Sequence, residues 1–332
     1  MNILIVNAED FGGGANKIAT SLLNRYNETG HRAKLLVREK NCNNPNIISV
    51  NNDAHRNIFW KFICKLQNYF LKERIKYVPR LLGYLKLITE PKRTIFDLLG
   101  FEDFKYPGFI KTLQSLQFEP DLIHCHNLHS DFFDLRLLIK LSNLTPTFLT
   151  LHDCWMFTGH CVYPYDCVKW QTTCRKCPYP NRSIQTKRDA SKINQWRKSR
   201  IYKKSKLHIS APSIWLTKMA QESILKKGAI EFKTIPNGID EAVFNPGCKI
   251  TARNEVGLSQ TKKIILFAGG SVSKNPAKGW NNLLILLDDA KSKENFPETD
   301  ILILGDSFED KVYGNISLKS VNWISSEREL VN

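Results

Sequence analysis

Short apolar runs alternate along the chain with segments in which apolar residues recur at helical spacing. The runs that predict buried strands are residues 2–7, 34–37, 122–125, 147–151, 207–211 and 231–235. Helices are predicted between them, among them one over residues 132–141 and one that Ser213 caps at its N-terminus. Because strands alternate with helices, the pattern predicts an α/β fold with a doubly wound parallel sheet.

Turn residues interrupt this alternation after the sixth strand. Pro236, Asn237 and Gly238, followed by Pro246 and Gly247, indicate a crossing between domains. A second alternation follows, with strands at 264–267, 301–304 and 321–324 and a helix from residue 279. The length of 332 residues also fits two domains. We predict an N-terminal Rossmann-like domain over residues 1–240 and a partial one over residues 241–332.

Residues 40–110 do not follow the alternation, and their function cannot be assigned from the pattern. They include basic amphipathic helices around residues 59–77. No segment approaches the roughly 18 consecutive apolar residues of a membrane span, and the N-terminus lacks the features of a secretion signal. We therefore expect a cytoplasmic protein whose cysteines are reduced.

Basic residues are concentrated in one segment of the chain. The chain carries a formal net charge of +16, and residues 187–206 hold nine Lys or Arg and a single acid, Asp189. This run is either a solvated helix face or a surface for anionic lipid or a phosphorylated substrate. A peripheral position on the inner face of the plasma membrane would follow from lipid binding. Nucleic acid is a weaker alternative, because it leaves the strand and helix alternation unexplained.

Four cysteines follow the fourth strand at close spacing. Cys161, Cys167, Cys174 and Cys177 leave five, six and two residues between neighbours. The closing two-residue spacing is typical of zinc sites, and the loops are long enough to bring four thiolates around one ion. The alternative is four unligated thiols, which would be an oxidation liability. We expect a structural zinc ion.

Two further features suggest chemistry at strand ends. Gly12, Gly13 and Gly14 follow the first strand and precede a helix, an arrangement that can hold a phosphate or sugar diphosphate, although glycines also make simple tight turns. The strand at 147–151 brings His152 and Asp153 to an edge that a substrate can reach. A histidine there can also do no more than cap the strand.

Several motifs together resemble a known family. They are GGGANK at 12–17, HNLH at 126–129, HDCWMFTGHC at 152–161, APSIWL at 211–216, IPNGID at 235–240 and the pair Lys278–Gly279. In this order they resemble retaining glycosyltransferases of the GT-B fold, and more narrowly the colanic acid and exopolysaccharide enzymes. The resemblance covers nearly the whole chain.

The resemblance implies a sugar transfer from a nucleotide-diphospho-sugar to a glycan acceptor, expected to be lipid-linked, in surface polysaccharide biosynthesis. It implies that His152 lies beside the reacting anomeric carbon. It places donor contacts at Gly13, Gly14, Lys17, Gly270 and Lys278, and acceptor-side residues at His126, Asn127, His129 and Asp153. A fixed ammonium and helix-terminal amides would stabilise the leaving diphosphate, so no catalytic metal is expected.

The sequence departs from the family pattern at three points. Lys17 stands where the family usually has arginine, and Ala277 and Ser271 lie where a second basic residue is usual. The family's paired glutamates lie beyond Asn332, so we expect a truncated family member. The alternative functions are a catalytically impaired remnant and an acceptor-binding scaffold stabilised by zinc.

Overall fold

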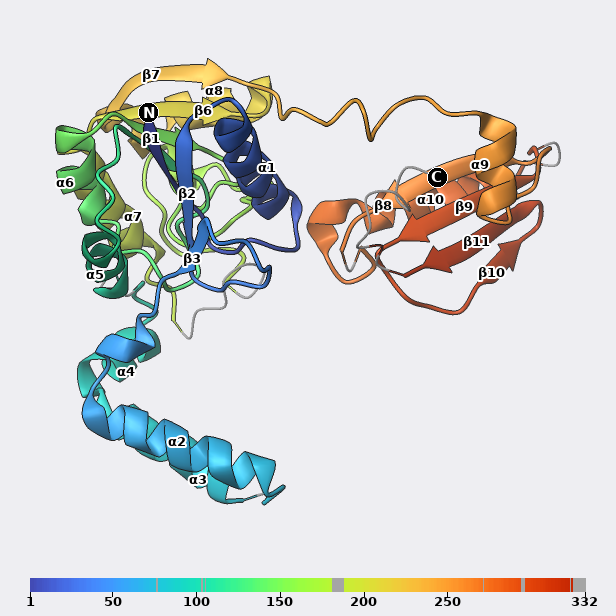
Figure 1. The fold of residues 1–332 in the computed structure, drawn as a ribbon. Helices are drawn as coiled ribbons and strands as arrows, with labels where there is room; N and C mark the ends of the chain where they lie inside the picture. The colour runs from blue at the N-terminus through green and yellow to red at the C-terminus, as the bar shows by residue number, and fades with distance from the viewer. Residues whose placement is uncertain are drawn as a thin grey trace. The chain divides into compact units, whose positions relative to one another are not determined.

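The computed structural model describes residues 1–75, 77–102, 104, 106–180, 188–270, 272–293, 296–322 and 324. The chain forms two compact units, Met1–Asn237 and Gly238–Asn332 (Figure 1). The division between the units falls after Asn237, close to the boundary that the sequence predicts after residue 240. Ser271 lies outside the described residues, as does Lys187 at the start of the basic run.

The first unit is built on a seven-stranded sheet whose order is β3-β2-β1-β4-β5-β6-β7. Every neighbouring pair of strands is parallel, which confirms the predicted doubly wound fold. Its strands are β1 Asn2–Val6, β2 Arg32–Val37, β3 Ile47–Ser49, β4 Leu122–Cys125, β5 Thr147–Thr150, β6 Leu207–Ala211 and β7 Ala229–Thr234. The pattern predicted all of these except β3, which has only three residues.

The helices of this unit connect and cover the strands. They are α1 Gly14–Glu28, α2 Ile58–Lys72, α3 Val78–Thr89, α4 Pro91–Leu98, α5 Gly108–Ser115, α6 Leu137–Leu144, α7 Ser191–Tyr202 and α8 Ile214–Glu222. The hydroxyl of Ser213 accepts a hydrogen bond from the Leu216 amide at 3.2 Å, which confirms the predicted cap of α8.

The predicted helix over residues 132–141 is wrong in its first half. Helix α6 begins only at Leu137, because Phe132, Phe133 and Leu135 belong to an irregular segment. All three side chains are buried in the hydrophobic core. Their apolar spacing therefore reflects a loop that is anchored in the core, which periodicity alone cannot distinguish from a helix.

Both faces of the seven-stranded sheet are buried. Along β1, Ile3 and Ile5 pack into one cluster with α1, whereas Leu4 and Val6 pack into the other with residues of α5, α6, α7 and α8. Burial on both faces is expected for a parallel sheet. It leaves the carboxyl ends of the strands as the edge where polar side chains can gather.

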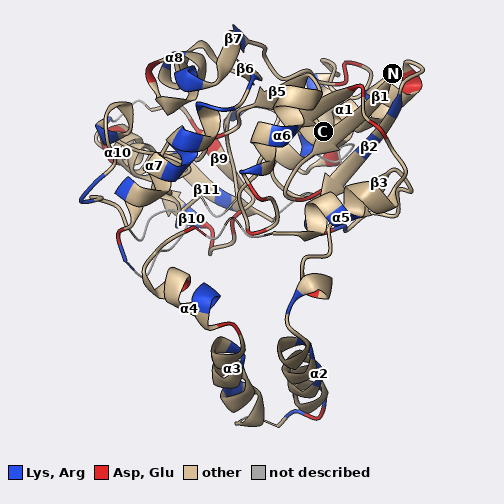
Figure 2. Cartoon of the chain, turned by 90° about the vertical axis from the view of Figure 1, so that its left-hand side faces the viewer, with Lys and Arg blue, Asp and Glu red and all other residues tan. Residues whose placement is uncertain are grey.

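Helices α2 and α3 depart from this layered arrangement. They pack against each other and form a hairpin that extends away from the sheet (Figures 1 and 2). No residue of α2 is buried, and in α3 only Pro79 and Leu82 are. Among the described residues, no helix is long and apolar enough to cross a membrane.

The second unit contains a four-stranded sheet in the order β10-β11-β9-β8. Its elements are α9 Lys249–Glu255, β8 Lys263–Ala268, α10 Trp280–Lys291, β9 Thr299–Leu304, β10 Lys311–Tyr313 and β11 Ile316–Val321. Strands β8, β9 and β11 are parallel, and β10 is antiparallel to β11. The strand predicted at 321–324 is wrong in position, because the strand that pairs with β9 ends at Val321. The buried Ile316 and Leu318 place it five residues earlier.

Candidate functional site

Three histidines gather at the carboxyl ends of β4 and β5. His126 Nδ1 and His152 Nε2 are 2.9 Å apart, and the two rings stack with their centroids 5.2 Å apart. His124 lies next to His126, with ring centroids separated by 4.4 Å. His124 lies on β4, and His126 follows the end of that strand. His152 follows β5, the strand that is hydrogen-bonded to β4. The parallel register therefore brings the two predicted histidines of these strands together.

Burial keeps these imidazoles uncharged near neutral pH. It lowers the pKa of His124 to about 4 and the pKa of His126 well below its usual value. Burial also lowers the pKa of His152, although the nearby Asp153 carboxylate opposes that shift. His126 Nε2 is buried without a hydrogen-bond partner among the described residues. His152 is only partly buried, so of the pair it is the ring that a substrate can reach.

Hydrogen bonds fix the ring of His124 from two sides. Its Nε2 lies 2.8 Å from the hydroxyl of Thr150 on β5, which in turn lies 2.8 Å from the hydroxyl of Ser210 on β6. Its Nδ1 lies 3.3 Å from the hydroxyl of Tyr26 on α1. His124 therefore supports the ring of His126 from behind, and sequence reasoning did not identify it.

A second pair lies beside the histidine cluster. His129 Nε2 is 3.0 Å from the Asp153 carboxylate, whose other oxygen accepts a hydrogen bond from the Trp155 amide at 2.8 Å. Ser130 and Asp131 follow with φ angles of 74° and 59°, a left-handed conformation that is unusual for residues other than glycine. Two adjacent strained residues next to a polar cluster are typical of functional loops.

The glycine loop is connected to the same edge through Asn7. The Asn7 side chain accepts a hydrogen bond from the Asn127 amide at 3.1 Å and donates one to Asn16 Oδ1 at 2.9 Å. Gly12 and Gly13 have φ angles of 74° and 51°, so the turn requires glycine at both positions. A Cβ atom at Gly12 would meet no atom within 4 Å, which leaves open space at the N-terminus of α1.

Lys17 and Gly14 lie in the first turn of α1, and both are exposed. Of the residues predicted to contact the donor in the first unit, Gly13, Gly14 and Lys17 therefore share one exposed helix N-terminus. Asn7 joins this terminus to the loop that carries His126. In the sequence, Asn7 stands out only by its position at the end of a buried strand.

The motif at 152–161 is mostly buried and serves to pack the domain. Between Cys154 and His160 every residue is buried, and only His152 and Asp153 lie toward the polar edge. Gly159 lies against α7, where a Cβ atom would come within 2.5 Å of Ser191. The identities of these motif residues are therefore largely explained by their contacts with α7.

A buried ion pair joins this motif to α7. Lys198 Nζ lies 3.2 Å from Glu102 Oε2, 2.8 Å from the Trp155 carbonyl oxygen and 3.6 Å from the centroid of the Trp155 ring. The Trp155 indole N–H donates to Glu102 at 2.8 Å. Burial raises the pKa of Glu102 and lowers that of Lys198, and each charge opposes the shift of the other. Lys198 is one of the nine basic residues in the run at 187–206, and it is not available to a partner.

The second unit presents a separate glycine turn. Gly269 and Gly270 follow β8, and a Cβ atom at Gly269 would lie 3.5 Å from the side chain of Lys278. Lys278 is exposed at the end of a short 3-10 helix, Pro276–Lys278. Gly279, with a φ angle of 77°, then begins α10. The turn, the ammonium group and a helix N-terminus therefore lie together, as a diphosphate site requires.

The four predicted zinc ligands line one small cavity. Cys161, Cys167, Cys174 and Cys177 share it with His160, whose Nε2 is 3.6 Å from Cys177 Sγ. The cavity volume of about 20 Å³ is enough for a single ion or water. Within the described ranges, however, no three His, Cys, Asp or Glu side chains are arranged as metal ligands. The residue types suit zinc.

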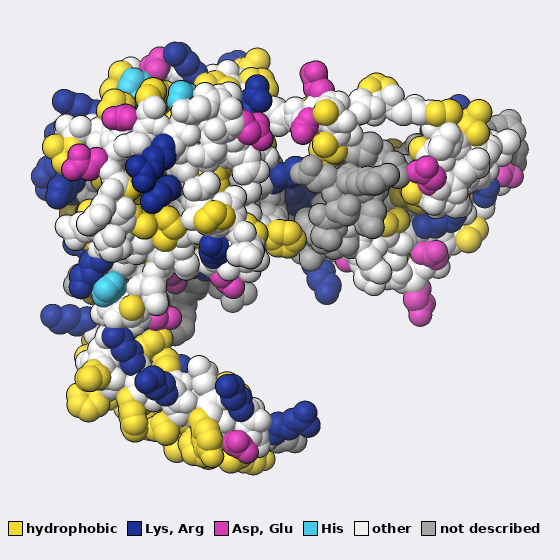
Figure 3. All heavy atoms as spheres, viewed as in Figure 1, with side chains coloured by type: hydrophobic (Ala, Val, Ile, Leu, Met, Phe, Trp, Pro, Cys, Tyr) yellow, Lys and Arg dark blue, Asp and Glu magenta, His cyan; other side chains and the backbone are white. Residues whose placement is uncertain are grey.

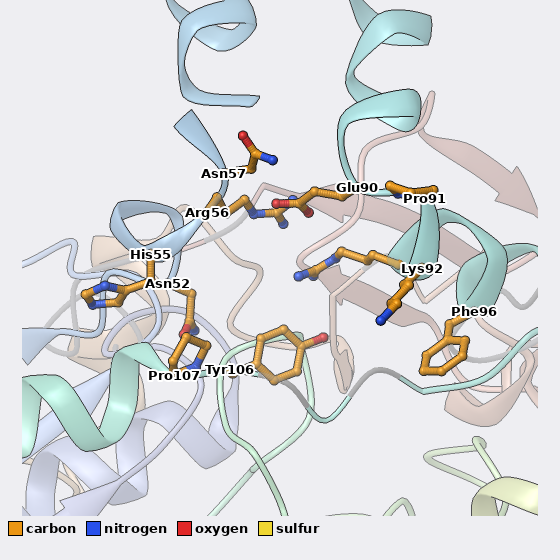
Figure 4. A pocket seen from close by; sticks show the side chains of 11 residues that line it. Asn52, His55, Arg56, Asn57, Glu90, Pro91, Lys92, Phe96, Tyr106 and Pro107 are labelled. Atoms are coloured by element: carbon orange, nitrogen blue, oxygen red, sulfur yellow. The ribbon is translucent and has the colours of Figure 1, made fainter. Parts of the chain in front are cut away.

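Two larger cavities border the first unit's polar edge and the hairpin. One, of about 210 Å³, is lined by His129, Asp131 and Trp155 among others. The other, of about 500 Å³, lies at the base of the α2–α3 hairpin, where His55 is among the residues that line it (Figure 4). Arg56, Glu90 and Lys92 are among the residues that line it.

No protein-family model matches the sequence. A segment of 124 residues is 36% identical to the colanic acid biosynthesis glycosyl transferase WcaC of Escherichia coli (strain K12), and it covers 35% of this chain and 28% of WcaC. Among solved structures, WaaG, a glycosyltransferase involved in lipopolysaccharide biosynthesis, aligns with a TM-score of 0.50 at 10% identity. That alignment covers 99% of this chain and 72% of WaaG. It confirms the predicted GT-B class of fold.

Proposed function

We propose that this chain is a glycosyltransferase of polysaccharide biosynthesis, which transfers a sugar from a nucleotide-diphospho-sugar to a glycan acceptor with retention of configuration. The observation that carries the proposal is the buried contact between His126 and His152 at the carboxyl edge of the sheet. The similarity to WcaC and the fold shared with WaaG support the same reaction class.

In this proposal His152 is the catalytic residue and contacts the sugar beside the reacting carbon. Its Nε2 is held by His126, so the ring orientation is fixed before the substrate binds. Because burial lowers its pKa, the imidazole is neutral and can hydrogen-bond a sugar hydroxyl without introducing a charge. His129, Asp153 and Asn127 would contact the acceptor.

The donor's diphosphate would bind to backbone amides and to lysine. Gly270, Lys278 and the N-terminus of α10 are suited to it in the second unit, and Gly13, Gly14 and Lys17 in the first. Negative charge builds up on the leaving diphosphate as the glycosidic bond breaks. A fixed ammonium and oriented amides therefore stabilise the transition state more than the bound substrate.

The proposal is tested by transfer assays on the chain with a panel of nucleotide-diphospho-sugars and lipid-linked acceptors. We expect His152→Ala to abolish transfer while donor binding measured by calorimetry is retained. His208→Ala is the matched control, because His208 lies on β6 outside the cluster and pairs with Glu231 at 2.9 Å. Equal transfer by the His152 variant and the wild-type chain would contradict the assignment.

The donor site has its own test. Lys278→Ala should weaken donor binding by about tenfold or more, because one charge-assisted hydrogen bond contributes roughly 1.5–3 kcal/mol. Lys311→Ala on the edge strand β10 is the control, since Lys311 is also exposed. Equal effects of the two substitutions would show that Lys278 does not contact the donor.

The structural zinc ion remains part of the proposal. Purified protein under reducing conditions should contain about one zinc per chain, as expected for four cysteine ligands. Cys174→Ser should lose it, whereas Cys248→Ser, at an exposed cysteine of the second unit, should not. A zinc content near zero in the wild-type chain would overturn this part without affecting the rest.

Peripheral attachment to an anionic membrane would bring the enzyme to a lipid-linked acceptor. In the basic run, Arg188, Lys192, Arg200 and Lys203 are exposed and can contribute, whereas Lys198 cannot. Substitution of these four by Gln should weaken binding to anionic vesicles at low salt. Unchanged vesicle binding would show that the run is a solvated helix face.

A further inference from the structure

The α2–α3 hairpin exposes large apolar side chains at a higher density along the chain than the rest of the first unit, with twelve between residues 58 and 88. Large hydrophobic side chains are exposed along both helices and the connection between them: Ile58, Phe59, Phe62, Tyr69, Leu71, Ile75, Tyr77, Leu81, Tyr84, Leu85, Leu87 and Ile88. Figure 3 shows hydrophobic side chains gathered along one edge of the hairpin. A contiguous exposed patch of this kind indicates an interaction surface.

The spacing of these residues places them on defined helix faces. On α3 they recur at intervals of three and four residues and therefore share one side of the helix: Leu81, Tyr84, Leu85 and Ile88. On α2, Ile58, Phe62 and Tyr69 are separated by four and seven residues and likewise share a side. Each helix of the hairpin thus presents an apolar stripe along its length.

The two helices hold each other through other side chains. Gln67 on α2 donates a hydrogen bond to the Pro79 carbonyl oxygen at 2.7 Å. Trp60 lies between two cations, with Arg56 4.2 Å and the Lys86 ammonium 5.4 Å from its ring. These contacts join the two helices, while the side chains of the stripes remain 40–75% exposed.

The hairpin is also strongly basic. Residues 58–89 contain seven Lys or Arg and one acid, Glu73, which is a net charge of +6 (7 − 1). At its base, Arg56, Lys92 and Arg93 line the cavity of about 500 Å³, where the Arg56 guanidinium pairs with Glu90 at 2.9 Å (Figure 4). Apolar stripes with flanking cations match the two layers of an anionic bilayer, acyl chains and phosphate headgroups.

We propose that the α2–α3 hairpin docks the protein on an anionic lipid bilayer by inserting its apolar stripes into the interfacial layer. With 15 and 12 residues, α2 and α3 are about 22 and 18 Å long, too short for the roughly 30 Å hydrocarbon core. The helices therefore lie along the surface. A second copy of the chain fits less well, because two faces with a net charge of +6 would repel each other.

This docking does not rest on the transfer reaction and differs from attachment by charge alone. It is tested by co-sedimentation of the full chain with vesicles of phosphatidylcholine and phosphatidylglycerol. We expect the wild-type chain to stay bound at about 1 M salt, where the Debye length is only about 3 Å. The variant F62S/L81S/L85S/I88S should lose binding by at least about tenfold, since four apolar side chains no longer enter the bilayer.

The matched control variant is L144S/V168S/I214S/I230S. Its four positions are exposed hydrophobic residues of the same unit that lie outside the hairpin, so vesicle binding should be unchanged. Circular dichroism of both variants checks that the helices remain folded. The proposal is overturned if the hairpin variant binds as the wild-type chain does, or if wild-type binding vanishes at high salt. It is also overturned if light scattering shows a lipid-free dimer that the hairpin variant dissociates.

Discussion

Two basic helical segments of the same unit, α7 and the α2–α3 hairpin, have opposite environments. Helix α7 has six buried residues. One of them is Lys198, whose ammonium group is buried against Glu102 and Trp155. In the hairpin, α2 buries none of its residues and exposes large hydrophobic side chains instead. The comparison shows that a high density of basic residues in a helix does not indicate whether that helix is covered or exposed.

The difference arises from what each helix packs against. Helix α7 meets the buried motif segment, where Gly159 allows close approach and the carbonyl oxygens of Trp155 and Thr158 accept hydrogen bonds from Lys198. Helix α2 packs mainly against α3. The charged group of Lys198 can thus be buried because hydrogen-bond partners surround it. The apolar side chains of α2 stay exposed because no other described part of the unit covers them.

The largest expected contrast concerns two lysines. Lys198→Ala should destabilise the first unit by about 3–5 kcal/mol, because it leaves the Glu102 carboxylate buried without its partner. Lys65→Ala on the exposed side of α2 should change the free energy of unfolding by no more than about 0.5 kcal/mol. Urea denaturation of both variants measures the contrast, and similar values would contradict the burial of Lys198.

The pH dependence of stability sharpens the picture of the buried histidines. The folded-state pKa of His124 is near 4, below its unfolded value of about 6.5, so stability is complete above pH 6.5. As the pH falls from 6.5 toward 4, the unfolded state binds more protons, and the free energy of unfolding decreases by about 1.4 kcal/mol per pH unit for this residue. His124→Gln should reduce the measured slope. If the free energy of unfolding of the variant depends on pH as steeply as that of the wild-type chain, the pKa of His124 is not lowered in the folded state.

Replacing glycine by alanine should have opposite effects on the free energy of unfolding beside α7 and in the hairpin. Gly159→Ala brings a Cβ atom within 2.5 Å of the Ser191 backbone, and we expect a loss of about 1–3 kcal/mol in the free energy of unfolding. Gly83→Ala in α3 meets only the Gln67 side chain at 3.7 Å and should stabilise that helix by about 0.5–1 kcal/mol. Denaturation measures the first, and hydrogen exchange of the α3 amides the second. Destabilisation by both would mean that the hairpin is packed as tightly as α7.

The smallest effect is expected for the apolar stripe itself. Leu81→Ser removes little buried apolar surface in the lipid-free chain, because Leu81 is already 61% exposed. Its free energy of unfolding should stay within about 0.5 kcal/mol of the wild-type value. Leu82→Ser at the buried neighbouring position is the control and should be clearly destabilising. A large loss for Leu81→Ser would indicate that the stripe stabilises the hairpin and is not a free surface.

Local sequence was sufficient for most of the first unit's fold. The run at 122–125 coincides with β4, and the run at 207–211 coincides with β6. Ser213 caps α8 as expected. These features depend on short-range propensity and on burial at both faces of a strand, which the residues themselves encode. The helix predicted at 132–141 failed because core-facing side chains of an irregular segment have the same spacing as a helix.

The sequence by itself determined the class of fold, the strand that delivers His152 and Asp153 to the sheet edge, and the cysteine spacing. Only the tertiary structure decided that His126 contacts His152, that His124 and Asn7 support the same edge, and that most of the motif at 152–161 is buried. It also decided that Lys198 is enclosed while the α2–α3 hairpin is exposed. The physical reason is that strand and helix formation follows from neighbouring residues, whereas burial depends on partners 26 to 96 positions away, as between His126 and His152 or between Lys198 and Glu102.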